Sequence, residues 1–240
     1  MKDIVCAEFI KMKRKRLFLL ALIGELLSFL VAYVFESRPG SKSWMNLLYN
    51  FSGFNFMIMI IVFTIIISKI VDIEHKSDMW KIEFISIEDK KLLYIAKFIC
   101  VLIIMFFSSC ITFSGLILLG NSIGIKGTAY GLILKQSLCP LIGYLPFIVL
   151  QLSISIMVKN QGVSIACGVI GCFLGVLGFA LPFGKILIWM YPFFTAPMIS
   201  ASNMSTVMNE SSVMFSFISI IVAGGMAFIS LRLYDKKEDL

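Results

Sequence analysis

Long apolar runs, separated by short polar or charged stretches, give this sequence its pattern. Six runs stand out, and they cover residues 17–35, 53–70, 98–119, 138–158, 162–181 and 213–231. About 20 apolar residues in helical form are needed to cross the hydrocarbon core of a bilayer. The pattern therefore predicts an all-α polytopic membrane protein, a single domain over residues 1–240 with about six transmembrane helices.

Composition points the same way. The chain of 240 residues is 59% hydrophobic and only 15% charged, whereas a soluble domain has about 25% charged residues. One globular core cannot hold so many apolar side chains, which excludes an ordinary soluble protein. The net charge of +7 then concerns membrane topology rather than nucleic-acid binding, because the basic residues gather at the ends of the apolar runs.

The basic residues also predict the orientation of the chain. Most of the 21 Lys and Arg residues fall in residues 1–16, in the stretch 69–97, at position 159 and in the C-terminal tail. The others are Arg38, Lys42, Lys126, Lys135 and Lys185. Cytosolic loops of membrane proteins carry an excess of Lys and Arg. We therefore expect a multi-pass protein of the cell membrane with both termini in the cytosol.

Residues 1–16 precede the first apolar run and mix apolar with charged side chains at roughly helical spacing. This spacing predicts a short amphipathic helix on the cytosolic leaflet, with the basic cluster 13–16 among anionic headgroups. A simple topogenic signal that keeps the N-terminus inside has the same charge pattern, and both interpretations can hold together.

The stretch 69–97 is the longest internal segment without membrane-like composition. Acidic and basic residues interleave there with apolar ones such as Ile73, Trp80 and Phe84. We predict a short cytosolic coupling helix between the second and third spans, with one face on the membrane domain and the other on a partner. A solvated loop is the alternative, but it would leave the large apolar surface of Trp80 in water.

One carboxylate, Glu25, falls near the middle of the first apolar run. A charge at this depth is costly, so the side chain is expected to face protein or water. It would then belong to the translocation region. Alternatively, it is hydrogen-bonded to a neighbouring helix or kept protonated by burial. Asn55, near the outer end of the second run, is a candidate for a hydrogen bond between helices.

Four glycines share one face of the fifth apolar run: Gly168, Gly171, Gly175 and Gly178. Small residues let membrane helices approach closely, so this face predicts tight packing, either within the subunit or between subunits. Residues 182–212 are less apolar and hold several aromatic, proline and asparagine residues. They predict an outer segment with interfacial or re-entrant helices rather than a full crossing.

Motifs for catalysis are absent from the sequence. It has no GxxxxGK[ST] loop for ATP and no HExxH, GxSxG or dinucleotide-binding GxGxxG motif. The single histidine, His75, cannot form a metal site, and the six cysteines lack CxxC spacing and are expected to be unpaired thiols. We therefore expect no enzyme and no metal or cofactor bound by this chain.

Two stretches carry a resemblance to a known family. Residues 7–14 read Ala-Glu-Phe-Ile-Lys-Met-Lys-Arg, and the central stretch has Glu74, then Trp80-Lys81, Ser86-Ile87 and Tyr94-x-x-Lys97. With about six spans, this order resembles the ABC type-2 exporter permeases and, among them, the small lantibiotic-immunity permeases. The turn that commonly holds a proline in that branch has none here.

The resemblance implies a bacterial membrane permease without a catalytic site of its own. Two copies of a cytosolic ABC ATPase, holding ATP and Mg, would drive it, and a second permease, related rather than identical, would complete the pore. The cargo would be an amphipathic, lantibiotic-like peptide expelled from the membrane lipid, with no role for nucleic acid. The residues expected to contact the ATPase are Glu74, Lys76, Trp80, Lys81 and Phe84, and Glu25 is expected in the translocation region.

Two other functions fit the same sequence. ABC export of another amphipathic substrate, such as a drug, a lipid or a polymer, would use the same architecture. A non-transporting membrane sensor or scaffold would also fit, and it would need no cytosolic ATPase.

Overall fold

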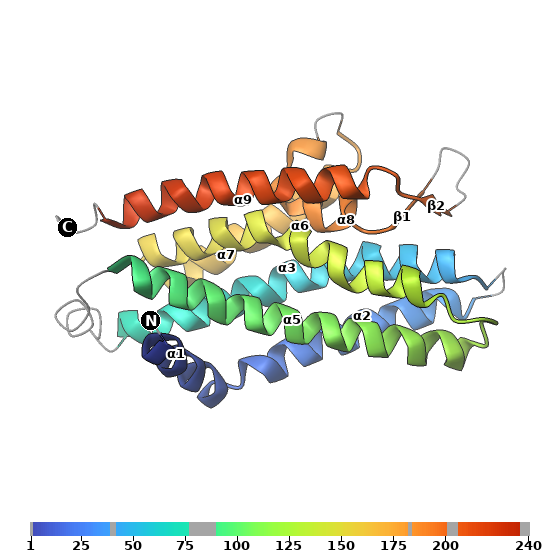
Figure 1. Cartoon of the computed structure of the whole chain (residues 1–240), viewed down its shortest axis with the longest axis horizontal. Coiled ribbons are helices and arrows are strands. Elements are labelled where there is room, and N and C mark those ends of the chain that lie inside the picture. Colours follow the sequence, from blue (N-terminus) through green and yellow to red (C-terminus); the bar gives the residue numbers. More distant parts are fainter. Residues whose placement is uncertain (1, 39–41, 77–89, 182–183, 201–205, 236–240) are drawn as a thin grey trace.

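The computed structural model describes residues 2–38, 42–76, 90–181, 184–200 and 206–235. Within these ranges the chain is a bundle of helices (Figure 1). The longer ones are α2 (Leu17–Glu36), α3 (Trp44–Lys76), α5 (Lys90–Ile123), α6 (Tyr130–Met157) and α9 (Ser212–Asp235), and the shorter ones are α1 (Lys2–Arg14) and α7 (Gln161–Leu177). Between α7 and α9 lie the 3-10 turns η1 (Gly184–Ile186) and η2 (Ile188–Met190), helix α8 (Tyr191–Phe194) and an antiparallel hairpin of β1 (Met198–Ser200) and β2 (Thr206–Met208).

The helices confirm the all-α, polytopic character that the apolar runs predict. In the described ranges, five helices are long and apolar enough to cross a membrane, namely α2, α3, α5, α6 and α9. The run expected as the fifth span forms α7, which is apolar but has only 17 residues. The expected count of about six spans is therefore five long helices and one shorter apolar helix.

The bundle has two distinct ends. Helix α1, the last turns of α3 and α9 and the first turn of α5 lie together at one end, on the left in Figure 1, which we call the loop end. The β1–β2 hairpin lies at the opposite end, which we call the hairpin end. Helix α1 is inclined to the long helices (Figure 1). The chain turns between α1 and α2 at Arg16, which adopts the left-handed conformation with φ 55°.

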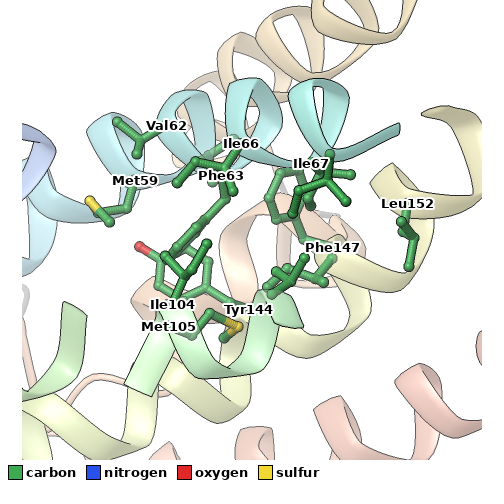
Figure 2. Close-up of a cluster of buried hydrophobic side chains, with 14 of the residues drawn as sticks. Met59, Val62, Phe63, Ile66, Ile67, Ile104, Met105, Tyr144, Phe147 and Leu152 are labelled. Carbon is green, nitrogen blue, oxygen red and sulfur yellow. The ribbon is translucent and has the colours of Figure 1, made fainter. Parts of the chain in front are cut away.

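Helix α3 is the centre of the bundle and packs against α2, α6 and α7. Figure 2 shows Met59, Phe63 and Ile66 of this helix beside side chains from α5 and α6, including Ile104, Met105, Tyr144 and Phe147. No hydrophobic effect drives helices together inside lipid, so close van der Waals contact and hydrogen bonds between helices carry this packing.

The second apolar run, which begins at residue 53, is part of a longer helix, because α3 already begins at Trp44. Trp44, Leu47 and Phe51 are buried at helical spacing and belong to a second core cluster at the hairpin end. Polar residues between them, such as Asn46, lower the local hydropathy and hide the helix from a search for apolar runs. Helix α6 likewise begins at Tyr130 rather than at residue 138.

Both edges of the stretch 69–97 are helical, since α3 continues to Lys76 and α5 already begins at Lys90. Charged residues at both edges are thus parts of long helices that extend beyond their apolar runs. The coupling helix expected within this stretch falls on residues 77–89, which lie outside the described ranges.

The segment 182–212 makes no full crossing in its described part, as expected. Short helical turns lead into the hairpin, which the sequence did not predict. Asn209 ties the two parts together: its Nδ2 donates to the carbonyl oxygens of Phe194 at 2.7 Å and Ala196 at 2.9 Å. The hydroxyl of Thr206 donates to the side-chain oxygen of Asn46 at 2.6 Å, which fixes the hairpin to α3.

The outward faces of the bundle are strongly apolar. In the most apolar 18-residue segment of α9, only 17% is buried within the chain. Its exposed side chains include Val213, Phe217, Ile221 and Phe228. Such a surface suits lipid tails or a neighbouring membrane helix, and it fits a helix that contacts the rest of the chain mainly through α6.

Candidate functional site

A buried ion pair joins α1 to α5 at the loop end. Lys97 donates from Nζ to Glu8 Oε2 at 2.9 Å, and Lys11 donates to Glu8 Oε1 at 2.6 Å. The exposed fraction is 0% for Lys97 and 2% for Glu8. Each carboxylate oxygen therefore has its own ammonium donor, as a buried charge requires.

The local sequence explains why α1 docks at this place. Val5, Glu8 and Met12 recur at helical spacing, so one side of α1 is turned toward the bundle. On α5, the thiol of Cys100 donates to the carbonyl oxygen of Val5 at 3.8 Å, one turn beyond Lys97. The pair thus lies about two turns into α5 from Lys90, the first residue of this helix.

Sequence reasoning did not predict this ion pair, although it quoted both residues in separate motifs. Residues 7–14 contain Glu8, and the Tyr94-x-x-Lys97 motif ends on its partner. The sequence did contain a signal for buried charges, because Glu8 and Lys97 are each a single charge on an otherwise apolar face of their own helix. The pairing itself joins residues 89 positions apart, and no local pattern specifies such a distance.

The Glu8–Lys97 pair predicts a pH dependence of α1 docking. Burial alone would raise the pKa of Glu8, but the ammonium groups of Lys97 and Lys11 outweigh burial and hold this pKa below its ordinary value. A lowered folded-state pKa means that the stabilisation is complete above the unfolded-state pKa and disappears as pH falls through the folded-state pKa. We expect hydrogen exchange of the amides in residues 2–14, corrected for its intrinsic pH dependence, to accelerate below the ordinary glutamate range.

The variant Glu8→Gln is the control for this measurement. It has no carboxylate to protonate, so exchange in α1 should start higher and stay flat through the same acid range. Equal pH profiles for the variant and the unaltered protein would contradict the assignment.

A second polar cluster lies within the bundle around Glu25, which is 2% exposed. Asn55 of α3 donates to Glu25 Oε2 at 3.0 Å and to the hydroxyl of Ser28 at 3.3 Å. Ser108 of α5 donates to Glu25 Oε1. The expected hydrogen bond of Asn55 between helices is therefore confirmed, and Glu25 connects α2 with both α3 and α5.

The Glu25 cluster continues toward α6. Ser52 donates to Gln136 Oε1 at 3.0 Å, and Ser109 donates to the carbonyl oxygen of Ser137 at 2.8 Å. Polar side chains from four helices thus meet inside a bundle whose outer surface is apolar. In membrane proteins such intramembrane polar residues face the bundle interior or a water-filled path.

A third polar cluster joins α3, α6 and α7 nearer the loop end. Ser68 donates to the hydroxyl of Ser164 at 3.2 Å, and Gln151 donates to the carbonyl oxygen of Ser164 at 2.9 Å. Gln161 donates to the carbonyl oxygen of Ser155 at 2.9 Å. These bonds satisfy backbone groups around the tight turn between α6 and α7.

Three glycines of α7, and Gly178 directly after its end, lie against other parts of the same chain. A Cβ atom at Gly168 would collide with Thr64 of α3, and one at Gly171 with the indole of Trp189. Gly175 also faces Trp189, at 3.2 Å, and a Cβ at Gly178 would stand 3.0 Å from Leu187. These contacts give the small residues a packing role within the subunit.

The residues expected to contact the ATPase are only partly within the described ranges. Glu74 and Lys76 lie on the last turn of α3, at the loop end. Trp80, Lys81 and Phe84 lie outside the described residues. Beside the end of α3 is a surface cleft of about 440 Å3. It is lined by Ser68, Lys69, Asp72, Lys159, Asn160, Gln161, Gly162 and Ile165.

The part of the chain that the structure describes contains neither a metal-binding cluster nor a disulfide. In the described ranges, no group of three or more His, Cys, Asp or Glu side chains is placed to hold a metal ion. All six cysteines are free thiols, as their spacing predicts.

Together these features define a multi-pass helical membrane protein with polar clusters in its interior and a helix docked across one end. The chain belongs to the ABC-2 family of transporters: the family model described as "ABC-2 family transporter protein" matches residues 4–178, from α1 through α7. It is thus a membrane permease subunit that works with a separate ABC ATPase, and this family of subunits generally has no catalytic site of its own. No curated protein and no solved structure matches the chain.

Proposed function

We propose that this chain is the permease subunit of a bacterial exporter that expels a lantibiotic-like, amphipathic peptide from the cell membrane. The proposal makes the loop end cytosolic, with both termini inside the cell. A second permease, related but not identical, would complete the translocation path. Two copies of the ATPase would bind ATP and Mg, and this chain would bind no cofactor.

The observation that carries the proposal is the contact between the two stretches in which the resemblance lies. Residues 7–14 and the end of the stretch 74–97 are joined by the Glu8–Lys97 ion pair at 2.9 Å. A push on residues 77–89 would reach Lys97 through the first two turns of α5 and would be passed to α1. This contact supports the proposal that Glu74, Lys76, Trp80, Lys81 and Phe84 couple the ATPase to the bundle.

The Glu25 cluster supports export rather than a purely structural role for the bundle interior. Glu25, Asn55 and Ser108 hold three helices together through bonds that rearrangement of those helices would break and re-form. A polar path between helices is what an amphipathic substrate needs on its way out of the membrane. We assign Glu25 to the translocation region on this basis.

The peptide substrate rests on the branch that the two stretches resemble. Export of a drug, lipid or polymer would use the same helices, and a sensor or scaffold would keep the fold without an ATPase. A bound partner therefore separates the transporter from the scaffold, and a protection assay separates the substrates.

The experiment is extraction of the unaltered chain from its native membrane under gentle conditions, followed by identification of the proteins bound to it. We expect a P-loop ATPase together with a second small permease. The double variant Trp80→Ala/Lys81→Glu should lose the ATPase, because it removes an apolar anchor and reverses a charge at the proposed contact. The matched variant Lys126→Glu, near the hairpin end, should keep it.

Each outcome bears on a separate part of the proposal. Recovery of the ATPase without a second permease would favour a homodimer. Equal ATPase recovery with the double variant would refute the coupling assignment, and absence of any ATPase would favour the sensor or scaffold. Sensitivity of cells to a lantibiotic, measured with and without the chain, tests the substrate.

A further inference from the structure

The Glu25 cluster surrounds a small internal cavity. Its volume is about 20 Å3, and about 10–15 Å3 measured in this way suffices for one water molecule. Polar residues of four helices line it: Glu25, Asn55, Ser108, Ser109, Thr112, Gln136 and Tyr144. Met59, Phe63, Met105 and Leu141 complete the lining, and Figure 2 shows three of them, Met59, Phe63 and Met105, near Tyr144.

One polar atom in this lining has no partner. The hydroxyl oxygen of Tyr144 is buried and makes no hydrogen bond within the described chain, and the side chain is 5% exposed. Buried hydroxyl groups are almost always bonded to protein or to ordered water. The unsatisfied hydroxyl beside a cavity of this size therefore indicates a bound molecule, and the volume admits nothing larger than one water.

The charge around Glu25 points to a second bound species. Its oxygens accept from the neutral groups of Asn55 and Ser108. Among the described residues, no Lys, Arg or His lines the cavity, and Tyr144 of α6 is the other lining residue that titrates. A carboxylate buried without a cation takes up a proton rather than remain charged.

We propose that Glu25 and Tyr144 form a binding site for one proton and one water molecule inside the helix bundle. The proton resides on the Glu25 carboxyl group. The water accepts from the Tyr144 hydroxyl and donates to the carboxyl group, and Thr112 and Gln136 stand at the same cavity to complete its shell. The site links α2 to α6 in addition to the direct bonds of Glu25 to α3 and α5. This inference stands independently of the substrate and of the ATPase.

Infrared spectroscopy of the full chain in lipid nanodiscs at neutral pH tests the site. We expect a carbonyl band of a protonated carboxylic acid that is absent from the Glu25→Gln variant, which keeps the shape of the side chain and one of its two acceptor oxygens. We also expect an O–H band of internal water that shifts in oxygen-18 water. The Tyr144→Phe variant should lose this water band and shift the carbonyl band, whereas Tyr49→Phe, away from the cavity, should change neither.

The outcomes decide both halves of the inference. A missing carbonyl band at neutral pH, or one that persists in Glu25→Gln, would contradict the assignment of a proton to Glu25. A band that is present only when choline replaces sodium also overturns it, in favour of a bound cation. An unchanged spectrum in Tyr144→Phe would contradict the assignment of a water molecule beside Tyr144. The Glu25→Gln and Tyr144→Phe variants in the ATPase pull-down keep this test separate from the proposed function, because neither residue is among the proposed ATPase contacts.

Discussion

Replacement of Lys97 by methionine should lower the free energy of unfolding by about 3–5 kcal/mol. Methionine keeps much of the length of the side chain but removes its charge. Glu8 would then remain buried with one ammonium partner, Lys11, on its own helix. Breaking a buried pair from one side leaves a charge that water cannot reach and that has lost one of its counter-charges. The remaining bond to Lys11 places the expected loss toward the lower end of this range.

The measurement combines chemical denaturation with a local probe. Cys100 is fully buried beneath α1 and contacts the backbone of Val5, so release of α1 exposes its thiol. Mass spectrometry after maleimide treatment should show labelled Cys100 in the Lys97→Met variant and little label in the unaltered protein. Lys13→Met is the control, because Lys13 is an exposed lysine of α1, the helix whose docking is tested.

The double variant Glu8→Gln/Lys97→Met sharpens this prediction. It removes both charges, so no unpaired charge stays buried, and stability should recover by most of the loss. A double variant as unstable as Lys97→Met would mean that the shape of Lys97, rather than its charge, holds α1. Full protection of Cys100 in the single variant would contradict the role of the pair.

The second large effect is expected at Gly143, where α6 passes α8. A Cβ atom there would lie 2.7 Å from the Cα of Pro192 and 2.8 Å from the carbonyl oxygen of Tyr191, and it would also collide with the hydroxyl of Thr195. Two of these neighbours are backbone atoms, which cannot rotate away as a flexible side chain can. Gly143→Val should therefore push α8 from α6 and destabilise the chain by about 3 kcal/mol, the upper part of the range for overpacking.

Gly131→Val is the matched control on the same helix. A Cβ atom at Gly131 meets nothing within 4 Å, and the residue is exposed. Valine should be neutral or slightly stabilising there, since glycine is the poorer helix former. The measurement compares the denaturation midpoints of the two variants. Equal midpoints would show that α8 can shift away from α6 without loss of stability.

The sequence predicted the helices of this fold because each has an apolar run. It misplaced their ends because the polar half of an amphipathic turn lowers the hydropathy of the turn as a whole. Trp44 and Lys90 both begin helices that extend well beyond their apolar runs. The β1–β2 hairpin escaped prediction because two strands of three residues each are too short for a clear alternation of apolar and polar positions.

The candidate site was predicted in part. The cost of a carboxylate in an apolar run marked Glu25, and the same logic marked Asn55. The partners of these residues depend on how helices are arranged, so Ser108 and Tyr144 could not be assigned from spacing. The Glu8–Lys97 pair escaped for the same reason, although single charges on apolar helix faces are a usable signal for buried pairs.

The hydrogen bonds of Glu25 also depend on the order in which the helices are synthesised and inserted into the membrane. Asn55 lies 30 residues after Glu25 in the chain and Ser108 lies 83 residues after it. At about 5–20 residues per second, the ribosome takes about 4–17 s to supply Ser108 once Glu25 has been made. During this interval α2 must enter the bilayer with its carboxyl group incompletely covered. Polypeptides truncated before α5 should therefore leave α2 poorly inserted and open to membrane proteases, while those that include α5 should hold it in place.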